Sequence, residues 1–189
     1  MTSFSTDACA TDAIPLPKKT VDGVAVVEDT GLLRIDGQRI KLWGIELLSP
    51  DQQCWQDGTA WLCGEETLFA LKHFVAGRLV HCAIEIPADE EGPAQAQCYR
   101  WKHGQRKDIA QHMIEEGWAL EKGEASGGIY FDAEQEAQGA KRGAWSGRFQ
   151  TPQDWQNGIP RFVGEGDESV APPLPPETEE EEDTDAPNE

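Results

Sequence analysis

The chain has 189 residues and a formal net charge of −19, from 35 acidic and 16 basic residues. The length allows one domain with a hydrophobic core and terminal extensions, while the acidity argues against strong nucleic-acid binding, because neutralised phosphate supplies most of that affinity. No stretch approaches the roughly 18 apolar residues that a membrane span needs, and residues 1–19 show no secretory signal peptide, although removal of one would leave the same pattern.

Three short strands are predicted near the N-terminus, after a polar, Pro-containing extended arm at residues 1–20. They occupy Val24–Val27, Leu32–Asp36 and Arg39–Ile45, where β-branched and other apolar residues gather. The Asp36-Gly37 pair between the second and third strands is a strong signal for a two-residue hairpin turn. Three strands in such close succession predict a small barrel.

A helix is predicted over Thr59–Ala76, and Gly77 stands where a helix-terminating glycine is expected. Four apolar residues recur there at helical spacing and can share one face: Leu62, Leu68, Leu71 and Val75. Two further strands are predicted at Leu79–Ile86 and Ala94–Trp101. The acidic loop 87–93, which contains Pro and Gly, joins them.

Two more helices are predicted at Asp108–Glu116 and Tyr130–Lys141. The order of three strands, a helix, two strands and two helices fits an α+β OB-fold, a five-stranded Greek-key β-barrel with a helix between its third and fourth strands. The barrel domain is expected to span 21–157. Residues 164–189 hold eleven acidic and no basic residues and cannot bury enough apolar surface to fold, so 158–189 is expected to be a disordered, acidic, Pro/Glu-rich tail.

Four of the five cysteines are placed as two pairs. Cys54 and Cys63 flank a short loop, and Cys82 and Cys98 fall in two predicted strands that would be neighbours, whereas Cys9 is left over. Two disulfides would favour an extracytoplasmic compartment, periplasmic or secreted. The alternative is four buried free thiols in a cytoplasmic protein. A zinc site is disfavoured, because Cys-x-x-Cys spacing and nearby His ligands are missing.

Segments along most of the chain resemble the staphylococcal-nuclease-like (SNase-like, or thermonuclease) family. Gly37–Ile45 resembles its hairpin and third strand, Ile114–Ala119 its second helix, and Tyr130–Trp145 its third helix and the turn that follows. Another group resembles a Cys-containing bacterial branch of the family: Gln52, Cys54, Trp61, Cys63 and Gly64. The resemblance spans Val21–Trp155 and implies the OB-fold. Some bacterial relatives with this Cys pattern are associated by name with succinoglycan (exopolysaccharide) biosynthesis.

The resemblance implies a calcium-dependent phosphodiesterase site whose reacting groups are replaced in this chain. In the family, two Asp help to hold the ion, a Glu positions water and two Arg stabilise phosphoryl charge. The Asp positions hold Gly31 and Glu46, the Glu position holds Ser49, and the Arg positions hold Lys41 and Pro93. Losing one such group costs on the order of 100- to 1000-fold in rate, so five changes together predict little hydrolysis.

The resulting hypothesis is a pseudoenzyme, a degenerate nuclease-like domain that acts as a binding or scaffold module without a cofactor. OB-folds bind ligands on the barrel face and its loops, so loops 46–58 and 87–93 are the expected surfaces for a protein or small-molecule partner. The resemblance links this module to bacterial envelope or exopolysaccharide processes. The alternative is a Ca²⁺-dependent DNA or RNA nuclease with rearranged ligands, for which Asp29, Glu46 and Asp51 are the candidate metal ligands.

A third hypothesis gives the acidic tail a binding role. Pro172–Pro176 could form a polyproline II segment, and the acidic run Glu179–Asp183 could engage a basic partner. The alternative is a tail that only keeps the protein soluble.

Overall fold

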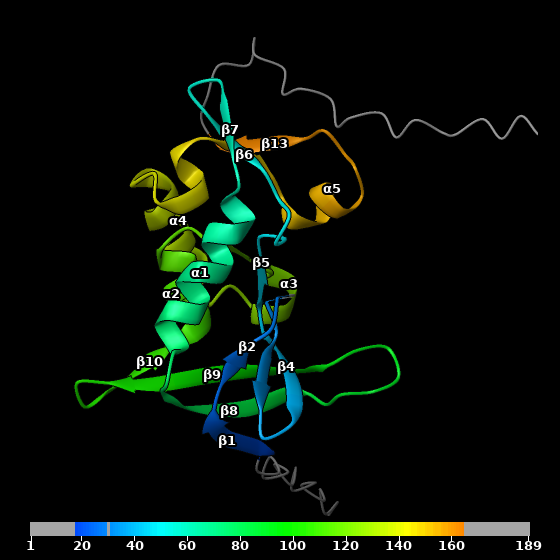
Figure 1. Cartoon of the computed structure of the whole chain (residues 1–189), viewed down its shortest axis with the longest axis vertical. Helices are drawn as coiled ribbons and strands as arrows, with labels where there is room; N and C mark the ends of the chain where they lie inside the picture. Colours follow the sequence, from blue (N-terminus) through cyan, green and yellow to red (C-terminus); the bar gives the residue numbers. More distant parts are fainter. Residues whose placement is uncertain (1–17, 30, 165–189) are drawn as a thin grey trace, which may run out of the picture.

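A computed structural model describes residues 18–29 and 31–164, and Figure 1 shows how their helices and strands are arranged. These residues form thirteen strands, five α-helices and one 3-10 helix, which confirms the α+β class predicted from the sequence. The expected arm before residue 18 and the expected tail after residue 164 lie outside the described residues, as does Cys9. Within the described ranges, no helix is both long and apolar enough to cross a membrane.

The largest sheet has seven strands, paired in the order β1-β8-β9-β4-β3-β2, with β10 paired to β9. They are β1 (Thr20–Val24), β2 (Val26–Val27), β3 (Leu33–Ile35), β4 (Gln38–Leu42), β8 (Leu79–Ile86), β9 (Ala94–Lys102) and β10 (Gln105–Asp108). All pairs are antiparallel except β4–β9, which is parallel. The predicted hairpin is confirmed: Asp36 and Gly37, both with positive φ, connect β3 to β4.

The first two strands stand at the two ends of this sheet, although only Ala25 separates them in the chain. β1 pairs with β8 and β2 pairs with β3. Ala25 is buried, as is Val21 on β1. Among the described residues the sheet is therefore an open path and not a closed barrel, because no backbone ladder joins β1 to β2.

Two smaller sheets extend the molecule away from the large one (Figure 1). In one, β5 (Ile45–Leu47) pairs with β11 (Ala119–Glu121). The other has the order β13-β12-β6-β7, with the bounds Phe162–Gly164, Arg148–Gln150, Cys54–Gln56 and Thr59–Trp61. β13 lies beyond residue 157, where the domain was expected to end, so regular structure continues to residue 164.

The helices are α1 (Cys63–Val75), α2 (Ile109–Glu115), α3 (Gly123–Ser126), α4 (Phe131–Gly139) and α5 (Pro152–Gln156), with the 3-10 helix η1 at Gly143–Ser146. α2 begins after Asp108, whose carboxylate accepts a hydrogen bond from the backbone N–H of Gln111. α5 begins after Thr151, whose hydroxyl accepts from the N–H of Asp154. Figure 1 shows α1 and α2 side by side over the large sheet, in keeping with their mutual contacts.

Two clusters of buried side chains form the core. The larger lies between the large sheet and the helices α1 and α2, and its fully buried members include Leu33, Ile35, Ile40, Leu71, Ile109, Met113 and Ile114. The smaller surrounds the first residue of α1 and joins it to η1 and β12. Its buried members are Leu48, Cys54, Cys63, Ala137, Ala144, Trp145 and Phe149.

Both predicted disulfides are present. Cys82–Cys98 joins residues directly opposite each other on β8 and β9. Cys54–Cys63 joins β6 to the start of α1. All four residues are fully buried, and because disulfides persist in oxidising environments, the pairing favours an extracytoplasmic location.

The helix predicted over Thr59–Ala76 is wrong at its N-terminus, because α1 begins at Cys63 and β7 occupies the preceding residues. The supposed loop between the cysteines is a hairpin of β6 and β7, whose turn is Asp57-Gly58 with φ of 50° and 77°. Leu62 is correspondingly 44% exposed and does not share the buried face of Leu71.

The third predicted strand, Arg39–Ile45, is interrupted at Trp43-Gly44, so that β4 and β5 belong to different sheets. Gly44 has a φ of 76°, which favours glycine. A Cβ atom at this position would lie 3.0 Å from Cβ of Ser126. The chain can therefore turn here and pass close to α3 only because residue 44 has no side chain.

Candidate functional site

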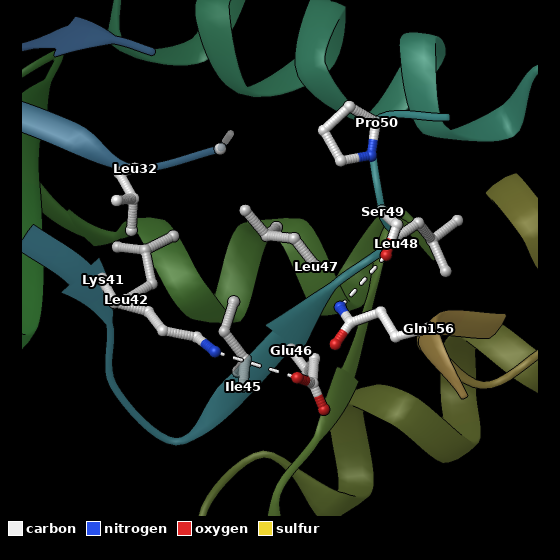
Figure 2. Close-up of a pocket in the computed structure, with 11 residues that line it drawn as sticks. Leu32, Lys41, Leu42, Ile45, Glu46, Leu47, Leu48, Ser49, Pro50 and Gln156 are labelled. Atoms are coloured by element: carbon white, nitrogen blue, oxygen red, sulfur yellow. Dashed lines mark hydrogen bonds and ion pairs between the residues drawn. The ribbon is translucent and has the colours of Figure 1, made fainter. Parts of the chain in front are cut away.

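A pocket of about 100 Å³ lies where β4, β5 and the segment after β5 meet α5 (Figure 2). Much of its wall is apolar and includes Leu32, Leu42, Ile45, Leu47, Leu48 and Pro50. Its polar side chains are Lys41, Glu46, Ser49 and Gln156. The volume of the pocket is below the roughly 300 to 1,000 Å³ of small-molecule sites, so the pocket encloses only part of a ligand.

Four of the five positions that the resemblance assigns to catalysis line this pocket: Gly31, Lys41, Glu46 and Ser49. The fifth, Pro93, does not line it. Pro93 lies in loop 87–93 beside a separate depression that also includes Arg39 and Asp89. In that loop the Asp89 carboxylate accepts hydrogen bonds from the backbone N–H groups of Glu91 and Gly92, so the carboxylate holds the turn itself.

The two ionisable side chains of the pocket face each other. Lys41 Nζ lies 3.7 Å from Glu46 Oε1, as the dashed line in Figure 2 marks. The Lys41 side chain is 40% exposed and that of Glu46 is 20% exposed, so water screens the pair and its contribution to stability is small. The pair nevertheless leaves the pocket with almost no net charge.

Ser49 is buried and held on both its backbone and its side chain. Its hydroxyl oxygen accepts a hydrogen bond from Gln156 Nε2 at 3.2 Å, and its N–H donates to Gln52 Oε1 at 3.1 Å. An amide cannot remove a proton from a hydroxyl, so this contact does not activate Ser49 as a nucleophile. Ser49 therefore contributes a hydroxyl group, held in place by hydrogen bonds, to the pocket wall.

Gln52 is fully buried and fixes the loop that carries Ser49. Its Nε2 donates to the backbone oxygen of Gln150 at 2.7 Å, and its own backbone oxygen accepts from the N–H of Gly64 at 3.1 Å. Gly64 stands so close to this loop that a Cβ atom there would lie 1.9 Å from the backbone carbonyl oxygen of Ser49. The start of α1 and the wall of the pocket are thus packed directly against each other.

The position that the resemblance assigns to the first Asp is unfavourable for a larger residue in this fold. Gly31 has a φ of 77°, and a Cβ atom there would lie 3.1 Å from Leu47 Cδ1. A side chain at this position would require both a left-handed backbone and a shift of Leu47. An Asp at this position would therefore be strained.

Each of the three candidate metal ligands, Asp29, Glu46 and Asp51, contacts a different partner. Asp29 accepts from Lys72 Nζ at 3.0 Å, and its side chain is 96% exposed. Asp51 accepts from Trp155 Nε1 at 3.3 Å. Only Glu46 lines the pocket, and no cluster of three or more His, Cys, Asp or Glu suited to a metal ion occurs within residues 18–29 and 31–164.

Sequence reasoning missed the roles of Gln52 and Gln156. Gln52 stood among the residues that carry the family resemblance, and a buried glutamine in a Pro-containing loop is a signal for a loop-fixing role. Gln156 gave no such signal, because it lies where the hydrophobic pattern fades and reaches the pocket only through the packing of α5.

The chain is similar to a curated protein over part of its length. No protein-family model matches the chain. Over 125 residues the chain is 30% identical to the "Succinoglycan biosynthesis protein ExoI" of Rhizobium meliloti (strain 1021). The matched region covers 65% of this chain and 63% of that protein, so the chain spans less than two thirds of its relative.

Proposed function

We propose that this chain carries a catalytically degenerate nuclease-like domain of the SNase-like (thermonuclease) type, which acts as a binding or scaffold module. The composition of the pocket in Figure 2 carries the proposal. One lysine and one carboxylate, paired with each other, stand where a calcium ion and a phosphoryl group would each need several ligands. Lys41 keeps a positive charge but lacks the planar fork of a guanidinium.

The proposed fold of the large sheet is an OB-fold, whose five-stranded Greek-key barrel is partly open. If Thr20–Val27 is counted as one strand bent at Ala25 and β10 is set aside, five strands remain. The bent strand then pairs with β8 through its first half and with β3 through its second half. The parallel β4–β9 pair, with α1 placed between β4 and β8 in the chain, fits the same fold.

The proposed process is exopolysaccharide or other envelope biosynthesis outside the cytoplasm. The R. meliloti relative is named as a succinoglycan biosynthesis protein, and both disulfides fit an oxidising compartment. The domain would hold a protein or small ligand with the loops 46–58, which include the end of β5 and all of β6, and 87–93. The first of these loops carries the rigid pocket wall at Ser49, so it presents a preformed surface.

A nuclease assay tests the proposal. The full, oxidised chain is incubated with single-stranded DNA and with RNA in millimolar calcium, beside the variants Lys41→Met and Glu46→Gln. We expect no cleavage by any of the three proteins. Weak cleavage of equal rate in all three would come from a contaminant. Cleavage by the wild type that both variants lack would overturn the proposal, because it would show that the pocket performs hydrolysis.

The process is tested in the organism that makes the protein. Deletion of the gene should lower the yield of exopolysaccharide, and a copy carrying Lys41→Met and Glu46→Gln should restore it if the module works without hydrolysis. An unchanged yield after deletion would refute the link to exopolysaccharide and leave the conclusion about hydrolysis intact.

A further inference from the structure

A second cavity, of about 620 Å³, lies between the ends of α1 and α2 and the end of β9. It shares no residue with the pocket of Lys41 and Glu46. Its volume falls in the range of small-molecule sites, roughly 300 to 1,000 Å³. The side chains that matter here are Phe74, Arg78, Arg100, Trp101, His112 and Glu116.

Arg100 is the unusual group in this cavity. It is 6% exposed, and its Nε makes no hydrogen bond. No ion pair joins Arg100 to any residue in the described part of the chain. The Arg100 Nε is therefore a buried N–H donor without an acceptor, which is unfavourable for folding and which an acceptor bound in the cavity would relieve. Burial, and secondarily the charge of Arg78, lowers the pKa of Arg100.

Aromatic rings fix the position of Arg100 without satisfying its N–H donors. Its Cζ lies 3.7 Å from the ring centroid of Phe74, and the His112 ring is stacked on Phe74 at 3.7 Å as well. At such short distances Arg100 and His112 must occupy opposite faces of the Phe74 ring. The cation–π contact holds the guanidinium plane but leaves its edge available for an oxyanion.

The charges around Arg100 favour an anion. Arg78 lines the same cavity, is exposed, and has no carboxylate partner within the described residues. Glu116 is the one acid among the lining residues, and it lies within electrostatic range of Arg142. Elsewhere in the described ranges, many cationic side chains already lie against carboxylates: Lys18, Arg34, Arg39, Lys41, Lys72, Arg142 and Arg161.

We propose that this cavity binds a small organic anion, whose carboxylate or phosphate group is held by Arg100 and Arg78 while its ring packs against Trp101. Trp101 lines the cavity and is 58% exposed, so its indole ring is accessible to a ligand. A guanidinium fork binds two oxygens of a carboxylate or phosphate at once. The site is independent of the function proposed for the first pocket.

A matched set of probes tests this site by isothermal titration at low salt: glucuronate, glucose 6-phosphate, glucose and inorganic phosphate. The three sugars share one ring, which carries a carboxylate in glucuronate, a phosphate in glucose 6-phosphate and no charge in glucose. Inorganic phosphate has the charge without the ring. We expect at least one of the two charged sugars to bind more tightly than inorganic phosphate, no binding of glucose, and weaker binding as salt is added. The tighter of the two charged sugars identifies the preferred anionic group.

The variant Arg100→Met should weaken binding about tenfold to a hundredfold, which is the range for a hydrogen-bonded charged group, and should be at least as stable as the wild type. If that variant does not fold, Arg78→Gln on the exposed side of the cavity provides the same test. Arg106→Gln is the matched control, because Arg106 is exposed and lies over Tyr99, outside the cavity. The proposal would be overturned if neither charged sugar binds, or if a charged sugar binds the wild type and Arg100→Met equally tightly.

Discussion

Lys41 Nζ and Glu46 Oε1 lie 3.7 Å apart, on two strands that the turn at Gly44 separates. Each residue is the nearest charge to the other in a pocket that contains no second carboxylate. A divalent cation entering this pocket would have to compete with the ammonium group for a single carboxylate.

This competition predicts that millimolar calcium leaves the melting temperature unchanged. A ligand that binds only the folded state raises stability by mass action, so a real site would give a shift that grows with calcium concentration. Differential scanning fluorimetry with calcium, against magnesium and sodium chloride at equal ionic strength, measures the effect. A calcium-specific rise that Glu46→Gln removes would show that the pocket is a metal site.

Gly64→Ala is expected to destabilise the protein by about 1 to 3 kcal/mol, because overpacking forces neighbouring backbone to move. The added Cβ would lie 1.9 Å from the backbone carbonyl oxygen of Ser49. This clash outweighs the higher helix propensity of alanine. Gly139→Ala is the control, since a Cβ at this α4 position meets nothing within 4 Å. Urea denaturation measures both variants. Equal effects of the two substitutions would contradict the close contact between α1 and the Ser49 loop.

Loss of the Cys82–Cys98 disulfide is expected to cost about 3 kcal/mol of unfolding free energy on the chain-entropy model for a short loop. The two residues are 16 apart in sequence and join the central strands β8 and β9. Denaturation of Cys82→Ala/Cys98→Ala beside the oxidised wild type measures the loss. A denaturation midpoint that matches the wild type would show that the bond contributes nothing to the sheet.

Asp154 is expected to make stability depend on pH in the acid range. Hydrogen bonds from Arg161 and then Thr151 hold the pKa of its carboxyl group below the ordinary value of 3.8. A depressed pKa contributes stability that is present above pH 3.8 and is lost as the pH falls through the folded-state pKa. Asp154→Asn should therefore lower the melting temperature at neutral pH.

In acid the difference in melting temperature between Asp154→Asn and the wild type should become smaller, because the wild-type carboxylate becomes protonated. Glu90→Gln, in the exposed acidic loop, is the control and should follow the wild type throughout. If the difference in melting temperature stays constant from pH 7 into the acid range, the loss of stability in Asp154→Asn comes from packing and not from ionisation.

Five strands of the large sheet were predictable because their signals are local, whereas β10 and all of β1 except its last residue were not predicted. The Asp36-Gly37 turn and the runs Leu79–Ile86 and Ala94–Trp101 carry turn chemistry and β-propensity within a few residues. The Cys82–Cys98 disulfide followed from the same strands, and Cys54–Cys63 followed from the short loop that its two cysteines flank. The hairpin before α1 was missed because Thr59–Trp61 continues the apolar spacing of the helix, although Asp57-Gly58 already carried the turn signal.

The rest depends on tertiary contacts. β12, α5 and β13 are short, and they are stable only through packing around Phe149 and the pairing of β12 with β6. The site shows the same division. The resemblance identified four positions that do line one pocket, while Gln156 enters it from an element without a local signal. The pairing of Lys41 with Glu46 depends on the turn at Gly44, which the expected continuous strand did not contain.

The position of Ala25 between two differently paired strands has a consequence for synthesis of the protein. Thr20 stands opposite Ala83, so β1 remains unpaired until β8, far along the chain, has folded. Such distant pairings fold slowly, and an unpaired edge exposes hydrogen-bonding groups to other chains. The folding chain is therefore most prone to aggregation before β8 docks on β1, and a chaperone that covers Thr20–Val24 until then should raise the yield of native protein.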